Sequence, residues 1–210
     1  RTEPPGGLSI MQRFYQASAL CAPDERIPLF GFCMLDTQYR MHPVIGDAIS
    51  HAFYGGSVTT GSPLYDTRSC PWPFLAVHVN GALDSTTTIS FSNSAEARAV
   101  VQLVSGFVLT VNPASIVVLA FYSAQVTLLQ GMLAAVSPLV RVASVDSMQG
   151  HEADVVIITC TRVGTQLGFL TVPTRVNVAL SRAKECVAVV GCMRSLSASQ
   201  LWSGVLRTAT

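Results

Sequence analysis

Residues 154–160 read Asp-Val-Val-Ile-Ile-Thr-Cys, an apolar and largely β-branched run with no regular polar alternation. Such a run is typical of a strand buried on both faces, as in a parallel sheet. Three further runs of this kind lie at 74–79, 115–121 and 186–191, and the last two are equally continuous. The sequence therefore predicts a parallel sheet.

Helical patterns alternate with these runs. Residues 93–110 open with Asn93 and Glu96 at capping-box spacing and then place apolar residues at helical intervals. Further helices are expected at 123–136, 174–184 and 198–207. The predicted fold class is α/β, with helices on both faces of the sheet.

The part of the chain before residue 74 follows a different pattern. We expect a helix at 9–20, a short apolar run at 29–35, and a helix at 43–53 that ends at Gly55-Gly56. Residues 55–73 are rich in Gly, Pro, Ser and Thr, which predicts a surface connection.

Composition excludes several classes of protein. Of 210 residues, 50% are apolar and 12% are charged, and the mean hydropathy is +0.45, which argues against disorder. No apolar run reaches the ~18 residues of a membrane helix. The net charge of +1 neither favours nor excludes a nucleic-acid partner.

The cysteines and the chain start give two further expectations. Six cysteines form no C-x-x-C pair, so we expect reduced thiols, no metal site, and a cytoplasmic or nuclear protein. The start, Arg-Thr-Glu-Pro-Pro-Gly-Gly, has no initiator methionine and no signal peptide, and predicts a fragment of a longer protein.

Three segments carry polar patterns that core packing does not require. Residues 38–43 read Gln-Tyr-Arg-Met-His-Pro and follow an apolar run, where a strand would end and a helix begin. Ligands of open α/β sheets bind at the carboxyl ends of strands. The alternative is a turn in which Arg40 makes a surface ion pair.

The second segment, residues 142–154, leads from an apolar strand through a polar loop to the next buried strand. Gly150 permits a backbone conformation that other residues resist, and Gln149 and Glu152 offer hydrogen-bonding groups on either side of it. A ligand with hydroxyl or phosphate groups would suit this loop. A tight connection with solvated acids is the alternative.

The third segment, residues 173–184, has the spacing of a helix. Arg175 and Arg182 are seven residues apart, so a helix over 174–184 would place both guanidinium groups on one side. A solvated basic face is the alternative.

Together these segments resemble motifs IV, V and VI, in order and spacing, of superfamily 1B helicases of the nonsense-mediated-decay type. The resemblance covers residues 35–191 and implies a RecA-like domain of the P-loop NTPase type. It departs from the family at Phe121, where a proline is commoner, and at Met148, where a phenylalanine is commoner. We expect residues 35–210 to form the second RecA-like domain and residues 1–34 to connect it to a first domain upstream.

The resemblance implies roles at an ATP site shared by two RecA-like domains. Arg40 and Arg182 would reach the γ-phosphate, and Gln149 would link the nucleotide to the nucleic-acid side. Tyr39 would stack on the base and Glu152 would bind the ribose. The remaining residues expected at the nucleotide are Gln38, Gly150 and Arg175.

The resemblance also implies a single-strand track for RNA or DNA, travelled 5′ to 3′, with Tyr122, Ser123, Ser144 and Asp146 lining it. No G-x-x-x-x-G-K-[ST] motif occurs in the chain, so the phosphate loop and the Mg²⁺ ligands are expected in the first domain. The chain alone should not hydrolyse ATP. The expected partners are the strand and the first domain, with no membrane.

Two alternative functions stay open. The first is a degenerate helicase that grips nucleic acid without turnover, which an intact phosphate-loop lysine upstream would exclude. The second is an unrelated α/β enzyme with a dinucleotide or methyl donor, which the lack of G-x-G-x-x-G after a strand disfavours.

Overall fold

The computed structural model describes residues 13, 34–68, 70–84, 90–148 and 150–207. Its contacts divide the chain into two units, Arg1–Leu35 and Asp36–Thr210. The helix expected at 9–20 lies outside the described residues apart from Arg13, and the run at 29–35 apart from its last two residues. The architecture below is that of the second unit.

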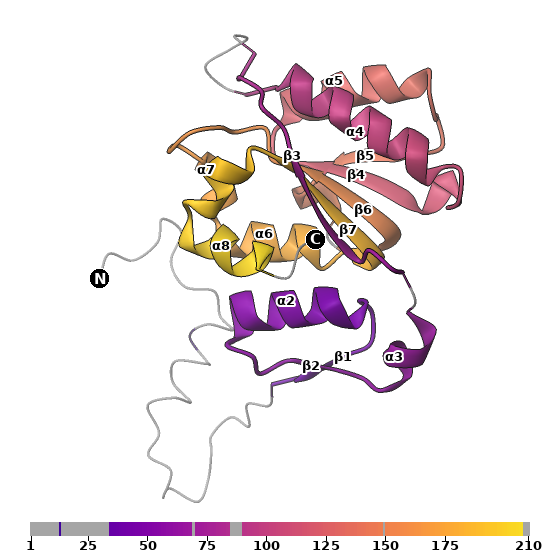
Figure 1. Cartoon of the computed structure of the whole chain (residues 1–210), viewed down its shortest axis with the longest axis vertical. Helices are drawn as coiled ribbons and strands as arrows, with labels where there is room; N and C mark the ends of the chain where they lie inside the picture. The colour runs from indigo at the N-terminus through magenta and orange to yellow at the C-terminus, as the bar shows by residue number, and fades with distance from the viewer. Residues whose placement is uncertain (1–12, 14–33, 69, 85–89, 149, 208–210) are drawn as a thin grey trace, which may run out of the picture. The chain divides into compact units, whose positions relative to one another are not determined.

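A five-stranded parallel sheet forms the centre of this unit (Figure 1). The strand order is β3-β7-β6-β4-β5, and every neighbouring pair is parallel. The strands are β3 (Phe74–His78), β4 (Ile116–Ala120), β5 (Arg141–Ser144), β6 (Ala153–Thr159) and β7 (Ala183–Gly191). The predicted parallel sheet is confirmed, and each of the four apolar runs forms a strand.

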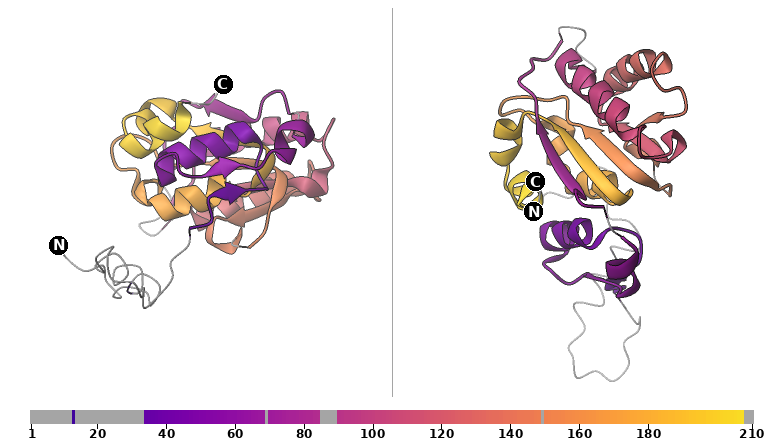
Figure 2. Two further views of the ribbon diagram at one scale, coloured as in Figure 1. Left: turned by 90° about the horizontal axis from the view of Figure 1, so that it is seen from below. Right: turned by 45° about the vertical axis from the view of Figure 1, so that its right-hand side comes forward.

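Helices cover both faces of the sheet, as Figure 1 and the turned views of Figure 2 show. One face packs against α4 (Ser94–Phe107) and α5 (Ser123–Ala134). The opposite face packs against α2 (Pro43–Tyr54), α6 (Pro173–Leu180), α7 (Met193–Ser197) and α8 (Gln200–Leu206). Alternate residues of β6 enter the two cores, Val156 and Ile158 on the α2 side and Val155 and Ile157 on the α4 side. This burial on both faces explains the continuous apolar runs.

The helices expected at 43–53 and 93–110 are confirmed as α2 and α4. Helix α2 begins at Pro43, where a missing N–H is harmless, and ends at Gly55, whose φ of 60° glycine adopts without strain. The helix expected at 123–136 is confirmed as α5.

Three boundaries differ from the prediction. The helix expected at 174–184 ends at Leu180, because the chain joins the sheet three residues later, where Ala183 pairs with Ala153. The helix expected at 198–207 forms as α8 over Gln200–Leu206, and the short helix α7 over Met193–Ser197, which precedes it, was not expected. The connection at 55–73 includes β2 (Thr59–Thr60), paired with β1 (Thr37–Gln38), and α3 (Pro63–Thr67).

The capping box of α4 is half formed. The Asn93 side chain accepts from the backbone N–H of Glu96 at 3.1 Å, as the pattern predicts. The Glu96 carboxylate turns inward instead, accepting from Thr159 Oγ1 and from the backbone N–H of Thr161, both at 2.7 Å. Thr161 has a φ of 66°, which is rare for a β-branched residue. Burial raises the pKa of Glu96 to about 7, outweighing the hydrogen bonds that lower it.

Two further properties concern the described residues alone. None of their helices has both the length and the apolar character needed to cross a bilayer. Their four cysteines, Cys70, Cys160, Cys186 and Cys192, are free thiols, and burial raises the pKa of Cys160.

The raised pKa of Glu96 predicts a pH-dependent stability. Protonated Glu96 is favoured in the folded state, so its stabilisation is complete below pH 4.5 and is lost as pH rises through 7. From this group we expect the free energy of unfolding to fall by about 2–3 kcal/mol between pH 5 and pH 8. Urea denaturation should show a smaller fall for Glu96→Gln, which cannot ionise. Asp47→Asn, exposed on α2, serves as control, and an equal fall in Glu96→Gln and wild type would contradict the prediction.

Candidate functional site

Residues of the three motifs lie at two opposite edges of the parallel sheet. Glu152 directly precedes β6 and Arg182 directly precedes β7, so both lie at the amino edge. Ser144 ends β5 and Tyr122 follows β4, so these lie at the carboxyl edge with Asp146. Helix α6 follows β6 and leads into β7, so it connects the carboxyl edge to the amino edge.

The amino edge carries what we call the arginine cluster, made of Arg40, Glu152, Arg182 and Lys184. Arg40 Nε donates to Glu152 Oε2 at 2.7 Å, and Lys184 Nζ lies 2.8 Å from Glu152 Oε1. Arg40 Nη1 also donates to the carbonyl of Ser181 at 3.2 Å. Arg40 and Arg182, 142 positions apart in the sequence, therefore meet at one place.

Arg182 is held mainly by backbone carbonyls. Its Nε donates to Val178 O and its Nη1 to His151 O, both at 3.1 Å. Burial lowers the pKa of Arg182, and the nearby Arg40 lowers it further. A second cation so close raises the free energy of the charged pair and favours an anion that touches both.

Charge in the arginine cluster is unbalanced. Three cations surround one carboxylate, and hydrogen bonds from Lys184 and then from Arg40 lower the pKa of Glu152. Glu152 is therefore ionised at neutral pH and cannot cancel all three positive charges. The excess suits a ligand with several negative charges, such as a polyphosphate.

Gln38 builds the turn that presents Arg40. Its side-chain oxygen accepts from the backbone N–H groups of Arg40 and Met41 at 2.9 and 2.8 Å. Its side-chain nitrogen donates to Met41 O and to Thr60 Oγ1, both at 2.9 Å. The side-chain amide of Gln38 thus serves the turn itself.

Tyr39 and His42 flank Arg40 on the same turn. Tyr39 is 67% exposed, and its ring lies so close to Gly61 that a Cβ there would collide with it. His42 caps α2, with Nδ1 accepting from Val44 N at 3.2 Å, and its backbone N–H donates to Lys184 O at 2.6 Å. Burial is the main cause that lowers the pKa of His42, which suits a neutral acceptor.

The structure brings together most of the residues expected at the nucleotide. Arg40, Arg182 and Glu152 are in or beside one hydrogen-bonded group, and Gly150 has the positive φ, 85°, that its place in the loop predicts. Gln149 lies outside the described residues. Arg175 lies near the start of α6, at the opposite end from Arg182, since Arg182 follows the helix and does not share its face.

The carboxyl edge differs from the expected strand track. Tyr122 is only 6% exposed, and its ring packs against Phe91 and Phe169 at centroid distances of 5.4 and 5.3 Å. Its hydroxyl accepts from Phe169 N at 3.3 Å. The exposed aromatic ring here is Phe169, with an exposed fraction of 43%.

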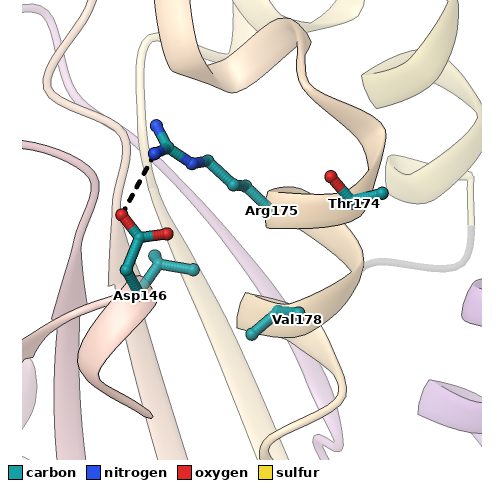
Figure 3. Close-up of a pocket in the computed structure, with 5 residues that line it drawn as sticks. Asp146, Thr174, Arg175 and Val178 are labelled. Atoms are coloured by element: carbon teal, nitrogen blue, oxygen red, sulfur yellow. Dashed lines mark ion pairs between the residues drawn. The ribbon is translucent and has the colours of Figure 1, made fainter. Parts of the chain in front are cut away.

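The other residues expected on the track are accessible. Ser123 is exposed and bonded to Ser90 through the two hydroxyls, at 3.1 Å. Ser144 is half-buried, and its hydroxyl accepts from Ser147 N at 3.2 Å. Asp146 is exposed and forms an ion pair with Arg175 at 3.1 Å (Figure 3).

Sequence reasoning missed three residues at these edges. Lys184 forms an ion pair with Glu152, the carboxylate of the second segment. Its place at the end of the third segment was the sequence feature that could have indicated it. Phe169 and Arg162 had no local signal, since Arg162 lies over the Phe91 ring (4.2 Å to the centroid) only because the loops after β3 and β6 converge. Within the described ranges, no group of three or more His, Cys, Asp or Glu side chains could hold a metal ion.

Comparisons with known proteins agree on one family. The family model described as AAA domain matches residues 8–194. The regulator of nonsense transcripts 1 homologue of Arabidopsis thaliana is 34% identical over 87% of this chain. The 5'-3' DNA helicase ZGRF1 of Mus musculus is 32% identical over 87% of this chain. The chain spans only 16% and 10% of these two relatives.

A solved structure supports the fold. The C-terminal domain of a possible DNA helicase from Lactobacillus plantarum has a TM-score of 0.53 and 17% sequence identity. The match covers 82% of this chain and 98% of that domain. The α/β fold with its parallel sheet is therefore that of a helicase C-terminal, RecA-like domain.

The hydrogen bonds of the Gln38 side chain predict that replacing Gln38 lowers the stability of the protein. Gln38→Leu removes all four hydrogen bonds of the side-chain amide and leaves part-buried backbone groups without them. We expect the free energy of unfolding to fall by about 1–3 kcal/mol in urea denaturation. Gln102→Leu, exposed on α4, should change it by less than about 0.5 kcal/mol. A Gln38→Leu protein as stable as this control would show that the turn does not need the amide.

Proposed function

We propose a function from this premise: the chain belongs to the AAA domain family, as the C-terminal RecA-like domain of a superfamily 1 helicase of the nonsense-mediated-decay type. The proposed function is that of a second motor domain, which supplies arginines to an ATP site and part of a single-strand track. The first domain, upstream, would supply the phosphate loop and the Mg²⁺ ligands. ATP hydrolysis by the two domains together would drive unwinding.

One observation carries this proposal, the meeting of Arg40 and Arg182 at the amino edge. Phosphoryl transfer depends mainly on positioning and on stabilising charge on the phosphoryl oxygens. A guanidinium is planar and offers several N–H donors, so it matches such oxygens better than an ammonium group does. Two guanidinium groups held by Glu152, Ser181 O and His151 O are already oriented before a ligand arrives.

The donor set of the arginine cluster fits ATP. ATP supplies the phosphoryl group whose hydrolysis provides the free energy for movement. Arg40 and Arg182 would donate to phosphate oxygens, and Glu152 offers the carboxylate that a ribose hydroxyl needs. The exposed ring of Tyr39 would stack on the base, with Gln38 holding its turn in place and Gly150 in the adjacent loop. Gln149 would link the nucleotide to the nucleic-acid side.

The carboxyl edge supplies the proposed strand track. Ser123, Ser144 and Asp146 are accessible there, and buried Tyr122 would act by positioning Phe169. Single-stranded RNA and DNA both remain candidate substrates, because the names of the relatives refer to transcripts in one case and to DNA in another. The second name also supports 5′ to 3′ movement. A cytoplasmic or nuclear site of action is part of the proposal.

Arg182→Ala and Arg40→Ala test the proposed ATP site. In the full-length protein, each should lower nucleic-acid-stimulated ATP turnover by roughly 10³-fold, because each removes a guanidinium from the developing phosphoryl charge. Lysine at either position should restore little turnover, because a point charge lacks the planar fork. Turnover at saturating oligonucleotide and oligonucleotide affinity are the two measurements, and affinity should change little.

Arg98→Ala, exposed on α4, is the matched control and should keep wild-type turnover. If Arg182→Ala abolished strand binding but left turnover per bound complex intact, the arginine would belong to a basic strand-binding face. Absence of turnover in the wild-type full-length protein, with strand binding retained, would favour the scaffold without turnover.

A further inference from the structure

A hollow at the carboxyl edge is lined in part by Arg175, whose guanidinium group points toward the carboxylate of Asp146 (Figure 3). Its volume is about 360 Å³, and we call it the Arg175 hollow. Its lining residues are Val145, Asp146, Thr174, Arg175 and Val178. None of the residues in the arginine cluster lines it.

The plane of the Arg175 guanidinium is fixed by a ring contact, and one of its nitrogens forms an ion pair. Its central carbon lies 4.2 Å from the centroid of the Phe169 ring, a cation–π contact that fixes the plane of the group. One terminal nitrogen, Nη2, makes the ion pair with Asp146 at 3.1 Å. A flat guanidinium can bind two oxygens of one oxyanion side by side, which a single carboxylate oxygen at Nη2 does not exploit.

The ion pair between Asp146 and Arg175 is easily exchanged. The side chains are 67% and 33% exposed, and exposed pairs contribute only ~0–1 kcal/mol to stability. The backbone at Asp146 is fixed from both sides by buried Val145 and Met148, so the carboxylate can rotate away without disturbing the core. The hollow, at about 360 Å³, also has room for an oxyanion. The Thr174 hydroxyl adds a further donor at its rim.

We propose that the Arg175 hollow binds one backbone phosphate of a single strand, and that Asp146 is an internal competitor that holds Arg175 until this phosphate replaces its carboxylate. The proposal takes the strand as ligand from the proposed function. It assigns Arg175 to the nucleic acid instead of the nucleotide. It also implies that Asp146 weakens strand binding, whereas a residue that contacts the strand would strengthen it. A carboxylate beside a phosphodiester repels it, so removing the charge should strengthen binding.

Four variants of the full-length protein test this exchange by fluorescence anisotropy. The probes are labelled oligo-dT and oligo-U of 15 nucleotides, without nucleotide cofactor, over a series of salt concentrations. Arg175→Met should weaken binding by roughly 10-fold and lower the salt slope by about one, because one phosphate contact is lost. Asp146→Asn should tighten binding by about 2- to 5-fold, the range expected when a weak internal ion pair no longer competes. Asp66→Asn, on α3, and Arg98→Ala, on α4, remove the same charges elsewhere and should leave the affinity unchanged.

The double variant separates competition from general repulsion. If Asp146 acts by occupying Arg175, the gain from Asp146→Asn should disappear in the Arg175→Met background. A gain that persists there, no gain, or weaker binding by Asp146→Asn would overturn the inference, the last because Asp146 would then contact the strand itself. Equal results with both probes support a phosphate contact, and an effect confined to oligo-U would overturn it in favour of a ribose contact.

Failure of the proposed function gives a different pattern. Loss of the arginine assignment would appear only in ATP turnover, which this binding assay does not involve. A wild-type protein that binds neither oligonucleotide would overturn both proposals.

Discussion

The parallel pairing of β6 with β7 is the constraint on which the candidate site depends. Ala153 and Ala183 are partners at the first rung of this pair, and Ala153 N donates to Arg182 O at 3.0 Å. The residue before each strand is therefore held beside the other, which places Glu152 near Arg182. The carbonyl of Lys184, one residue further, accepts from His42 N and attaches the Arg40 turn to the same rung. Backbone hydrogen bonds of the sheet thus assemble three segments that the sequence separates.

Much of the fold could be predicted from the sequence, because burial on both faces leaves a local pattern. Strand β4 is apolar throughout, and β6 and β7 contain the continuous apolar runs 155–158 and 186–191, while the caps of α2 and α4 are local signals. The end of α6 could not be predicted, since residues 181–184 continue the helical pattern and only the pairing of Ala183 with a distant strand ends it. The side-chain direction of Glu96 is similar, because its partners Thr159 and Thr161 lie more than 60 positions away.

Part of the candidate site could likewise be predicted from the sequence, and part could not. Local pattern and family resemblance selected Arg40, Glu152 and Arg182, and the structure brings them together. The expectation that ligands meet the carboxyl ends of strands does not describe this cluster, which lies at the amino edge of β6 and β7. Burial of Tyr122 and exposure of Phe169 depend on how the loops after β4 and β6 pack together, which no local pattern encodes.

Helix α6 gives Arg182 two different supports. Its backbone belongs to the sheet through Ala153, whereas its side chain is bonded to Val178 O in the last turn of the helix. A small rotation of α6 about its axis would therefore act on Nε of Arg182, whereas Nη1 is bonded to His151 O, outside the helix. The helix has eight residues and is about 12 Å long. The direction of the Arg182 guanidinium thus depends on three segments at once: the sheet, which holds its backbone, α6, which binds Nε, and the loop before β6, which binds Nη1.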